Sequence, residues 1–379
     1  MNDKLSPDSE RLRLLSFKSA LELGKKVDAH LLKMYGLDAE QSSFLIPTKE
    51  IWFNDGHEKV ELQDTVRSKD VYFLTDIGNY SLEYTMHGFI NHTSPNDLIQ
   101  QLKDGIGSCK CHTSSICIIM PLLFAGRQHR RKGREALSCA AFLHDLDASK
   151  QVNQLITFDA HDEGVQQALF DTEFDNFHAS NYIIEKFIAN ATKEELKDLL
   201  FVAPDYGATG RTNFYLNSFN SPFIKKETGS FYKERDYNNL VNGKYPVLKH
   251  EYSGGCDLAG KTALVIDDMI ASGGSMFDVI DGLNQKGVKN IYIITTYALF
   301  TEGIEKFKEY YALGRFSGIY TTNLSYIPQE YQTEPWLNIV DCSKLVAEII
   351  FNLHNNLSIS SLLNDRSYPA RLLEKKFSE

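Results

Sequence analysis

The hydrophobic positions of this chain fall into short apolar runs that are separated by segments with helical spacing. Thr262–Ile266 is apolar and β-branched, which is typical of a strand buried in a parallel sheet. Apolar residues at helical spacing follow and share one face: Met276, Val279, Ile280 and Leu283. Gly287 ends this helix, and a second apolar run occupies residues 291–298. The pattern predicts a strand–helix–strand unit.

The same alternation predicts the rest of the fold. We expect strands at residues 59–62, 71–75, 115–120, 155–158 and 200–203. We expect helices at residues 9–36, 96–106, 134–146, 181–189, 193–200, 303–311 and 342–355. Strands that alternate with helices form parallel sheets. The sequence therefore predicts an α/β protein with two parallel-sheet domains, residues 1–178 and 179–379, and with the helix at 342–355 as a candidate to pack back on the first domain.

Composition and charge narrow the possible functions. The chain has 379 residues, of which 42% are hydrophobic and 24% are charged, as in globular proteins with buried cores. Its formal net charge of −10 argues against nucleic acid or an anionic membrane as a partner. No apolar run approaches the length of a membrane span, and the N-terminus lacks a signal-peptide pattern. We therefore expect a cytoplasmic protein. The cysteines are scattered, and Cys109-Lys-Cys111-His112 lacks a second pair at metal-ligand spacing.

The strand at Thr262–Ile266 is followed by residues that suit the binding of a phosphorylated sugar. Asp267 and Asp268 follow it directly, and a Ser-Gly-Gly-Ser loop precedes the helix. Glycines and a helix N-terminus let backbone N–H groups approach an anion, and the serine hydroxyls can donate to the same phosphate. The two carboxylates would repel that phosphate, so we expect them to face sugar hydroxyls and a divalent cation. A solvated turn with two capping carboxylates is the alternative.

Two other strand ends carry charged residues. Residues 126–135 follow the strand at 115–120 and include Arg127, Arg130 and three further basic residues. Such a loop can clamp a polyphosphate, although a solvated basic loop would have the same composition. The strand at 200–203 is followed by Asp205 and a glycine-containing loop that reaches Arg211. Parallel sheets bind ligands at these carboxyl ends.

Residues 267–275 resemble the ribose-phosphate loop of type I phosphoribosyltransferases and of ribose-phosphate pyrophosphokinases, many of which carry Asp-Asp-x-x-Asp-Thr-Gly-Gly-Thr. Ala271 stands where an aspartate is usual, and serines replace both threonines. The resemblance implies two type I phosphoribosyltransferase-like (Rossmann-like) domains. It also implies a ribose-phosphate site formed by Asp267, Asp268, Ser272, Gly273, Gly274, Ser275 and Arg211.

The N-terminal half resembles the pyrophosphokinases at further motifs. Phe53-Asn-Asp55-Gly-His57 matches Phe-x-Asp-Gly-Glu, which in the family reaches the adenine of ATP bound mainly to a neighbouring subunit. By residues alone this segment is a hairpin turn. Arg127, Gln128 and Arg130 match an ATP-binding loop in which His129 replaces an aspartate. His161 matches the histidine that helps hold magnesium in the family. The resemblance thus implies an ATP site formed by Phe53, Asp55, His57, Arg127, Gln128, Arg130 and His161.

The catalytic candidates are Lys233 and Arg235. A Lys-x-Arg triplet alone indicates only surface charge, but the family carries one here at the start of a mobile loop. Residues 236–260 are polar and suit a lid. Asp205 matches an aspartate of the family, whereas Tyr206 and Ala208 depart from its pattern. The resemblance implies Mg²⁺ held by His161, Asp205, Asp267 and Asp268.

The motifs stand in the family's order over nearly the whole chain, and Phe-Tyr-Lys-x-Arg-Asp and Asp-Ala-His are closest to its longer bacterial branch. The implied function is transfer of pyrophosphate from ATP to C1 of ribose 5-phosphate, which yields phosphoribosyl pyrophosphate and AMP. The implied assembly is a homo-oligomer, at least a dimer and by the family rule a hexamer. Three alternatives stay open. They are the same transfer to a larger acceptor such as ADP-ribose, a phosphoribosyltransferase, and a non-catalytic regulatory homologue.

Overall fold

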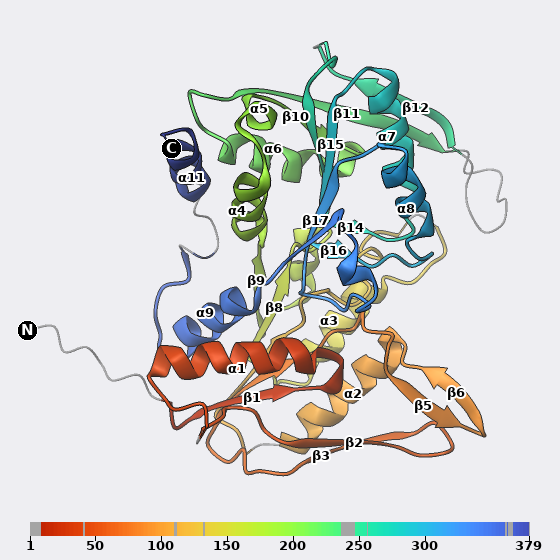
Figure 1. Cartoon of the computed structure of the whole chain (residues 1–379). Coiled ribbons are helices and arrows are strands. Elements are labelled where there is room, and N and C mark those ends of the chain that lie inside the picture. Colours follow the sequence, from red (N-terminus) through yellow and green to blue (C-terminus); the bar gives the residue numbers. More distant parts are fainter. Residues whose placement is uncertain are drawn as a thin grey trace, which may run out of the picture. The chain divides into compact units, whose positions relative to one another are not determined.

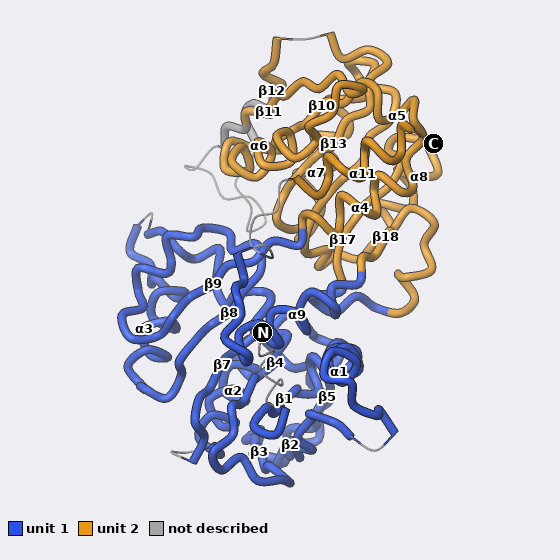
Figure 2. The backbone as a smooth tube through the Cα atoms, turned by 90° about the vertical axis from the view of Figure 1, so that its left-hand side faces the viewer, with its two compact units in different colours: residues 1–179, 323–328, 341–364 blue, residues 180–322, 329–340, 365–379 orange. Residues whose placement is uncertain are grey.

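The computed structural model describes residues 9–378, with gaps at 41, 110–111, 132, 236–246, 256, 361 and 363–366. The chain divides into two compact units (Figures 1 and 2). Unit 1 contains residues 1–179, 323–328 and 341–364, and unit 2 contains residues 180–322, 329–340 and 365–379. The C-terminal part of the chain therefore contributes segments to both units.

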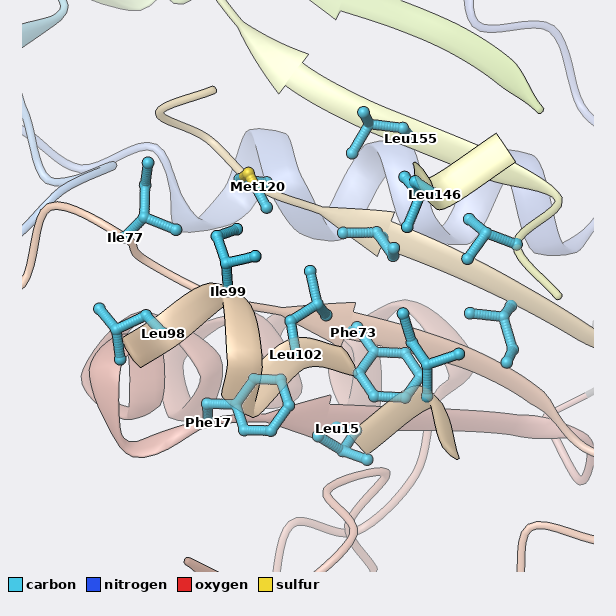
Figure 3. Packing of buried hydrophobic residues seen from close by; sticks show 14 of the residues in the cluster. Leu15, Phe17, Phe73, Ile77, Leu98, Ile99, Leu102, Met120, Leu146 and Leu155 are labelled. Carbon is cyan, nitrogen blue, oxygen red and sulfur yellow. The ribbon is translucent and has the colours of Figure 1, made fainter. Parts of the chain in front are cut away.

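Unit 1 is built on a five-stranded sheet in which all neighbouring strands are parallel. In spatial order the strands are β1 (Leu12–Ser16), β4 (Asp70–Leu74), β7 (Ser115–Ile119), β8 (Gln154–Phe158) and β9 (Glu173–Phe177). Its helices are α1 (Leu21–Tyr35), α2 (Pro95–Cys109), α3 (Ser138–Ala148) and α9 (Ser343–His354). Apolar side chains from the sheet, α2 and α3 pack in a buried core, which Figure 3 shows around Phe17, Phe73 and Leu102. This packing fixes the strand ends from which the functional loops depart.

The beginning of the chain corrects the sequence prediction, because residues 9–36 do not form one helix. Leu12–Ser16 is the strand β1, which pairs in parallel with β4, and α1 begins only at Leu21. Leu12, Leu14 and Leu15 are fully buried. Leu12 and Leu14 lie on one face of the strand and Leu15 on the other, so these residues suit a strand that is covered on both faces.

Two antiparallel hairpins complete unit 1. The first joins β2 (Thr48–Trp52) to β3 (Glu58–Leu62), and the second, which the sequence pattern did not predict, joins β5 (Glu83–Met86) to β6 (Phe89–His92). The rings of Trp52 and Tyr84 stack with their centroids 4.0 Å apart. The His87 N–H donates to the Asn54 carbonyl at 2.8 Å. The second hairpin therefore supports the turn of the first.

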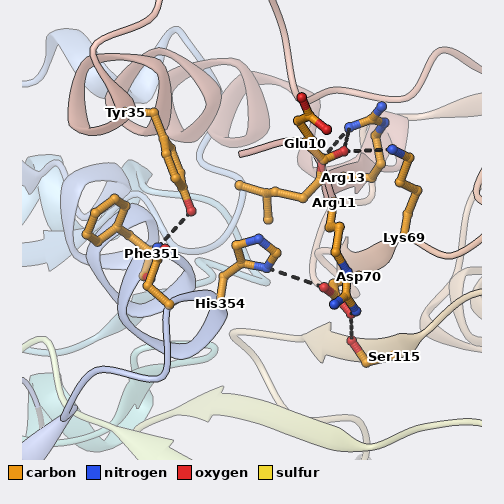
Figure 4. Close-up of polar contacts among 11 residues, drawn as sticks. Glu10, Arg11, Arg13, Tyr35, Lys69, Asp70, Ser115, Phe351 and His354 are labelled. Carbon is orange, nitrogen blue, oxygen red and sulfur yellow. Dashed lines mark hydrogen bonds and ion pairs between the residues drawn. The ribbon is translucent and has the colours of Figure 1, made fainter. Parts of the chain in front are cut away.

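Helix α9 packs on α1 within unit 1, although more than 300 residues separate the two in sequence. The Phe351 ring meets the Tyr35 ring edge-on at 4.9 Å, and the Asn355 amide donates to the Tyr35 hydroxyl at 2.8 Å. At the end of the helix, His354 Nδ1 lies 3.7 Å from a carboxylate oxygen of Asp70 (Figure 4). Ring packing and polar contacts at the C-terminal end of α9 thus attach it to the first unit.

Unit 2 is built on a seven-stranded sheet that is parallel except for the edge strand β12. In spatial order the strands are β12 (Val247–Ser253), β11 (Lys225–Arg235), β10 (Asp198–Ala203), β13 (Thr262–Ile266), β15 (Asn290–Ile294), β17 (Gly318–Thr322) and β18 (Leu337–Val340). The helices are α4 (Ser180–Asn190), α5 (Lys193–Lys197), α6 (Thr209–Ser218), α7 (Gly274–Gln285), α8 (Glu305–Ala312) and α11 (Ser367–Ser378). All five residues of β13 are buried, as its apolar sequence predicts.

The segment expected to be a lid is only partly described. Residues 236–246 lie outside the described residues. The prediction was wrong for Val247–Ser253, which forms β12 and pairs in antiparallel fashion with β11.

The predicted fold class is confirmed, since the protein is α/β and contains two predominantly parallel sheets. In the described part of the chain, no helix combines the length and the apolar character that crossing a membrane requires.

Candidate active site

Three neighbouring strands of unit 2 bring predicted site residues to one edge of the sheet. β11, β10 and β13 are parallel neighbours, with Ala203 paired to Ser230 and Val202 paired to Val265. Asp205 follows the end of β10, and Asp267 follows the end of β13. Carboxyl ends of adjacent parallel strands lie at the same edge, which is where open α/β sheets bind ligands.

The two adjacent aspartates differ in exposure. Asp268 is only 2% exposed, whereas Asp267 is partly exposed. Asp267 Oδ1 accepts from the Asp268 N–H, and Asp268 Oδ1 accepts from the Met269 N–H, both at 2.9 Å. Burial and the neighbouring Asp268 carboxylate raise the pKa of Asp267 well above its ordinary value, while the Arg211 guanidinium acts in the opposite direction. Asp267, Asp268 and Arg211 therefore form one electrostatic group.

A short strand lies between the aspartates and the glycine loop. β14 (Met269–Ile270) pairs in parallel with β16 (Tyr297–Ala298), and the Ala271 carbonyl accepts from the Thr301 N–H at 3.0 Å. These contacts hold the backbone between Asp268 and the glycine loop. The position at which the family usually has an aspartate is thus part of a fixed backbone, although its alanine side chain carries no charge.

The loop requires glycine at residue 273. Gly273 is the N-cap of α7 and has a φ of 83°, a conformation that residues with a Cβ rarely adopt. A Cβ there would lie 2.6 Å from Cζ of Phe307, whereas the nearest atom to a Cβ at Gly274 would be 3.9 Å away. Ser272, Gly274 and Ser275 surround this start of the helix. The first N–H groups of a helix lack intrahelical partners, so this geometry suits an anion.

Asp205 is exposed and caps the short 3₁₀ helix η3 (Tyr206–Ala208) by accepting from the Ala208 N–H at 3.2 Å. The adjacent Tyr206 is 87% exposed, although aromatic side chains are usually covered. Arg211 lies partly buried in α6, the helix that follows η3. Asp205, Tyr206 and Arg211 thus belong to one strand-to-helix connection.

Lys233 and Arg235 lie on β11 where this strand continues past the end of β10. Ser230 pairs with Ala203, the last residue of β10, and beyond it Lys233 pairs with His250 of β12. The side chains at 233–235 lie outside the described residues, so their catalytic roles stay predictions. The backbone nevertheless extends from the edge at which Asp205 and Asp267 lie.

In unit 1, Phe53, Asp55 and His57 lie in the exposed turn between β2 and β3. The Phe53 N–H donates to the His57 carbonyl at 2.8 Å, and Asp55 Oδ1 accepts from the His57 N–H at 3.1 Å. Gly56 supplies the positive φ of 88° that closes the turn. A folded turn that presents an aromatic ring which is 48% exposed suits contact with a planar base.

The basic loop and His161 follow neighbouring parallel strands, β7 and β8. The loop is longer than expected, because α3 begins at Ser138 rather than at residue 134. Arg127, Gln128 and Arg130 are exposed. His129 is less exposed than these residues, and its ring centroid lies 5.2 Å from that of His161. The structure thus brings together the predicted nucleotide loop and the predicted metal ligand of unit 1.

Sequence reasoning missed the carboxylate that joins these groups. Asp162 accepts from Arg130 Nη2 at 2.9 Å and lies 3.4 Å from His129 Nε2. The Gly164 N–H, and after it the Arg130 guanidinium, hold the pKa of Asp162 below its ordinary value. The available signal was its position, directly after the Asp-Ala-His161 motif at a strand end.

A second pair was also missed. His178 Nδ1 lies 2.6 Å from Oδ1 of Asp159, whose side chain is 3% exposed. Asp159 follows β8 and has a φ of 45°, and His178 follows β9, a strand that the sequence pattern did not reveal. Three histidines, at positions 129, 161 and 178, therefore follow three neighbouring strands of unit 1.

The donor set fits a magnesium ion that shares its coordination with substrate. Among the described residues, no group of three or more His, Cys, Asp and Glu side chains could hold a metal ion by itself. Mg²⁺ is usually bound by one or two carboxylates together with waters and substrate phosphates. Asp205 and Asp267 offer such carboxylates. Burial, and after it the Asp268 carboxylate, raise the pKa of Asp267, and a bound cation would stabilise its charged form. His161 belongs to unit 1 and Asp205 to unit 2, so their sharing of one ion stays a prediction.

The comparisons with known proteins agree with this geometry. Residues 12–149 match the model of the N-terminal domain of ribose phosphate pyrophosphokinase, and residues 172–321 match the phosphoribosyl transferase domain. A ribose-phosphate pyrophosphokinase of Synechococcus elongatus is 26% identical over 359 residues, which cover 94% of this chain and 95% of that protein. One of Mycoplasma genitalium is 26% identical over 316 residues, covering 82% of this chain and 84% of that protein.

A solved structure shares the fold. The phosphoribosylpyrophosphate synthetase of Mycobacterium smegmatis superposes with a TM-score of 0.71 at 20% identity and covers 92% of this chain and 100% of that chain. Two parallel-sheet units, one with an aspartate-tipped strand and a glycine loop, define a protein of the phosphoribosyltransferase fold class. More specifically, the chain belongs to the ribose-phosphate pyrophosphokinase family. The predicted family is therefore confirmed.

Proposed function

We propose that this protein is a ribose-phosphate diphosphokinase. It transfers pyrophosphate from ATP to C1 of ribose 5-phosphate and releases AMP and phosphoribosyl pyrophosphate. Family membership supports this reaction. The observation that carries the proposal is the edge of the unit 2 sheet, where Asp205, Asp267 and the extension of β11 follow three adjacent strands.

Ribose 5-phosphate binds at the start of α7. Its 5-phosphate receives hydrogen bonds from the N–H groups around Gly273 and Gly274 and from the hydroxyls of Ser272 and Ser275. Arg211, which is electrostatically coupled to Asp267, adds positive charge nearby. The carboxylates of Asp267 and Asp268 face the sugar hydroxyls and the cation, because they would repel the phosphate. This division accounts for acidic and anion-binding groups within one short segment.

ATP binds at the carboxyl edge of the unit 1 sheet. Arg127 and Arg130 contact the phosphate chain and Gln128 supports the nucleotide, because planar guanidinium groups bind phosphate oxygens in pairs. The adenine is contacted by Phe53, Asp55 and His57 of a neighbouring subunit, so the active protein is a homo-oligomer. Mg²⁺, the proposed cofactor, would neutralise phosphate charge while held by His161, Asp205, Asp267 and Asp268.

The transfer step requires positive charge around the reacting phosphate. The anomeric hydroxyl attacks the β-phosphorus, its proton is lost, and the bond from that phosphorus to the oxygen of AMP breaks. Lys233 and Arg235 stabilise the charge that spreads over the phosphate oxygens. In such transfers, positioning and electrostatic stabilisation supply most of the acceleration.

The test is AMP formation by the full chain from ATP, magnesium and ribose 5-phosphate. We expect AMP only when both substrates are present, and we expect Lys233→Ala to lower kcat by about 10²–10³-fold, by analogy with the loss of one oxyanion donor. ATP binding by this variant, measured by calorimetry, should persist. Unchanged turnover would remove Lys233 from the mechanism. Consumption of phosphoribosyl pyrophosphate without ATP would instead assign a phosphoribosyltransferase.

One observation favours a second acceptor class. Tyr206 is 87% exposed beside Asp205, and Ala271 removes a carboxylate from the usual sugar loop. An exposed aromatic ring offers a surface on which a planar group can stack. The same transfer onto a larger acceptor with a ribose 5-phosphate end, such as ADP-ribose, is therefore the second candidate. Mass spectrometry of products from parallel incubations with the two acceptors distinguishes them.

A further inference from the structure

Asp162 connects two loops at the carboxyl edge of the unit 1 sheet. It is the first residue after His161, at the end of β8, and it faces the basic loop at residues 126–135 that follows the adjacent strand β7. Arg130 and His129 of this loop both approach the same carboxylate oxygen, Oδ2, at 2.9 and 3.4 Å. The contact joins residues 32 positions apart in sequence.

The other oxygen of Asp162 is also engaged. Oδ1 accepts from the Gly164 N–H at 2.8 Å and thereby caps the 3₁₀ helix η2 (Glu163–Ala168). The carboxylate is therefore attached to its own backbone on one side and to the basic loop on the other. A side chain held in this way has one orientation, and it transmits that orientation to its partners.

His129 carries the connection to His161. Its Nδ1 lies 3.1 Å from the Gly126 carbonyl oxygen and its Nε2 faces Asp162, so acceptor oxygens face both ring nitrogens. The side chain is 14% exposed, and its ring lies 5.2 Å from that of His161. Because contacts at both ring nitrogens hold this imidazole, it provides a fixed surface on which the His161 ring packs.

Arg130 differs from His129 in exposure. Its side chain is 74% exposed although one terminal nitrogen is bonded to Asp162. A guanidinium has five N–H donors, so the remaining donors stay available to an anionic ligand. Because one edge of the Arg130 guanidinium is anchored, the direction of the other edge is fixed. Less conformational entropy is therefore lost when a phosphate binds to it.

We infer that Asp162 is a positioning residue of the nucleotide site: its carboxylate orients Arg130 for the phosphates of ATP and, through His129, orients His161. The inference rests on the proposed function and adds to it a residue that supports the site without touching substrate. It also explains how the loop accommodates a histidine at position 129, where the family has an aspartate. Here the acidic group comes from the neighbouring strand end instead.

The test compares Asp162→Asn with Asp162→Glu in the full-length protein. The neutral amide keeps the size of the side chain but weakens the charge-assisted contact with Arg130, so we expect the Kd for MgATP, measured by calorimetry with a non-hydrolysable ATP analogue, to rise about tenfold. The KM for ATP should rise to a similar extent, while kcat and the KM for ribose 5-phosphate change less than about threefold. Asp162→Glu restores the charge and should recover most of the affinity.

Glu163→Gln is the matched control. Glu163 is the adjacent carboxylate, but its contacts are with the Asn176 amide at 2.8 Å and with His178 at 3.6 Å rather than with the basic loop. The nucleotide affinity of the Glu163→Gln variant should equal that of the unmodified protein. Thermal unfolding of each variant shows whether a loss of affinity comes from loss of the fold.

A double variant tests whether Asp162 affects nucleotide binding through Arg130. If Asp162 acts through Arg130, the effects of Asp162→Asn and Arg130→Ala on nucleotide affinity are less than additive. Unchanged or tighter nucleotide binding by a folded Asp162→Asn variant would overturn the inference, and tighter binding would mean that Asp162 competes with the phosphates for Arg130. If the unmodified protein binds MgATP but releases no AMP, the proposed function fails while the affinity comparison still decides the role of Asp162. If it binds no nucleotide, both fail.

Discussion

At the scale of single residues, Gly273 is where the proposed phosphate loop depends most directly on amino-acid type. Its φ of 83° lies in the left-handed region, and an added Cβ would overlap Phe307, which is itself buried. Backbone strain and steric overlap therefore coincide at one position. The requirement is local, so the Ser-Gly-Gly-Ser pattern was sufficient to predict a special loop from sequence.

Gly273→Ala should lower the free energy of unfolding by about 1–3 kcal/mol and should also raise the KM for ribose 5-phosphate, because the backbone that faces the phosphate must shift. Urea unfolding and steady-state kinetics measure the two effects. Gly274→Ala is the control for stability: its φ is not positive and the space around its Cβ is open, so the free energy of unfolding should not fall. Equal stability of the two variants would contradict this account of the loop.

The supporting residues were harder to predict than the ligand-facing ones. Asp267 and His161 stand in motifs whose spacing can be read along the chain. Asp162 and His178 acquire their roles from partners on neighbouring strands, and neither pairing has a periodic signal in the sequence. Which carboxylate reaches which cation is decided by strand order, and the order β7–β8–β9 becomes known only with the fold.

At the scale of elements, continuous apolar runs predicted the central strands well. Thr262–Ile266 was expected as β13 with the observed bounds, because a strand covered on both faces has no competing polar signal. β1 was mistaken for helix because its apolar run leads without a break into the true helix α1. β5 and β6 escaped notice because their exposed residues, including Phe89 at 73% and Ile90 at 71%, follow no core pattern.

The contact of α2 with β2 and β3 contains two acidic residues that no pattern signalled, the buried Glu50 and the partly buried Glu58. Gln101 of α2 donates to Glu50 of β2 at 3.1 Å and to Glu58 of β3, while Glu58 Oε2 and Gln101 Oε1 are buried without a partner. Burial raises the pKa of Glu58 from 4.5 to about 7, and the charge of Glu50 adds to the shift. A protonated Glu58 can also donate a hydrogen bond, so the site favours the neutral acid.

This pair predicts a pH dependence of stability. Between pH 4.5 and about 7 the folded protein holds a proton on Glu58 that the unfolded chain has released. The contribution of Glu58 to the free energy of unfolding should therefore fall as pH rises through this window and should level off above it. Urea unfolding at successive pH values measures the slope, and Glu58→Gln, which is neutral throughout, should remove this contribution.

Glu61→Gln is the control for that experiment. Hydrogen bonds from Gln63 and Lys59 lower the pKa of Glu61, so its contribution changes only as pH falls below about 4.5, the ordinary value for glutamate. The slope between pH 4.5 and 7 should therefore persist in this variant. The slope should be shallower, not absent, in Glu58→Gln, because Asp76 and Asp267, whose burial also raises the pKa, still contribute. An unchanged slope in Glu58→Gln, or a shallower one in Glu61→Gln, would assign the titration to another group.

At the scale of the whole molecule, the residues of the proposed site come from several separate parts of the protein. The nucleotide loop belongs to unit 1, the sugar loop and β11 belong to unit 2, and the family resemblance assigns the Phe53 turn to the ATP of a neighbouring subunit. Within unit 1 that turn is exposed and is supported by β5–β6, as a contact offered to another molecule requires. The number of subunits and their arrangement are properties that a single chain does not encode in any local pattern.

Mixing inactive variants tests whether the site is shared between subunits. Phe53→Asp should impair the adenine contact and Lys233→Ala the transfer step. If one subunit provides Lys233 and its neighbour provides Phe53, random mixing of equal amounts restores about a quarter of the sites, because each intact site needs one unmodified residue from each side. Subunits must be exchanged by dilution or mild denaturation, and AMP release at ATP concentrations far below the KM of Phe53→Asp measures the gain.

The control mixes the unmodified protein with a chain that carries both substitutions. A shared site then leaves about a quarter of the sites active, whereas a site contained within one chain leaves about a half. No gain in the first mixture together with half activity in the second would show that Phe53 serves its own chain or none.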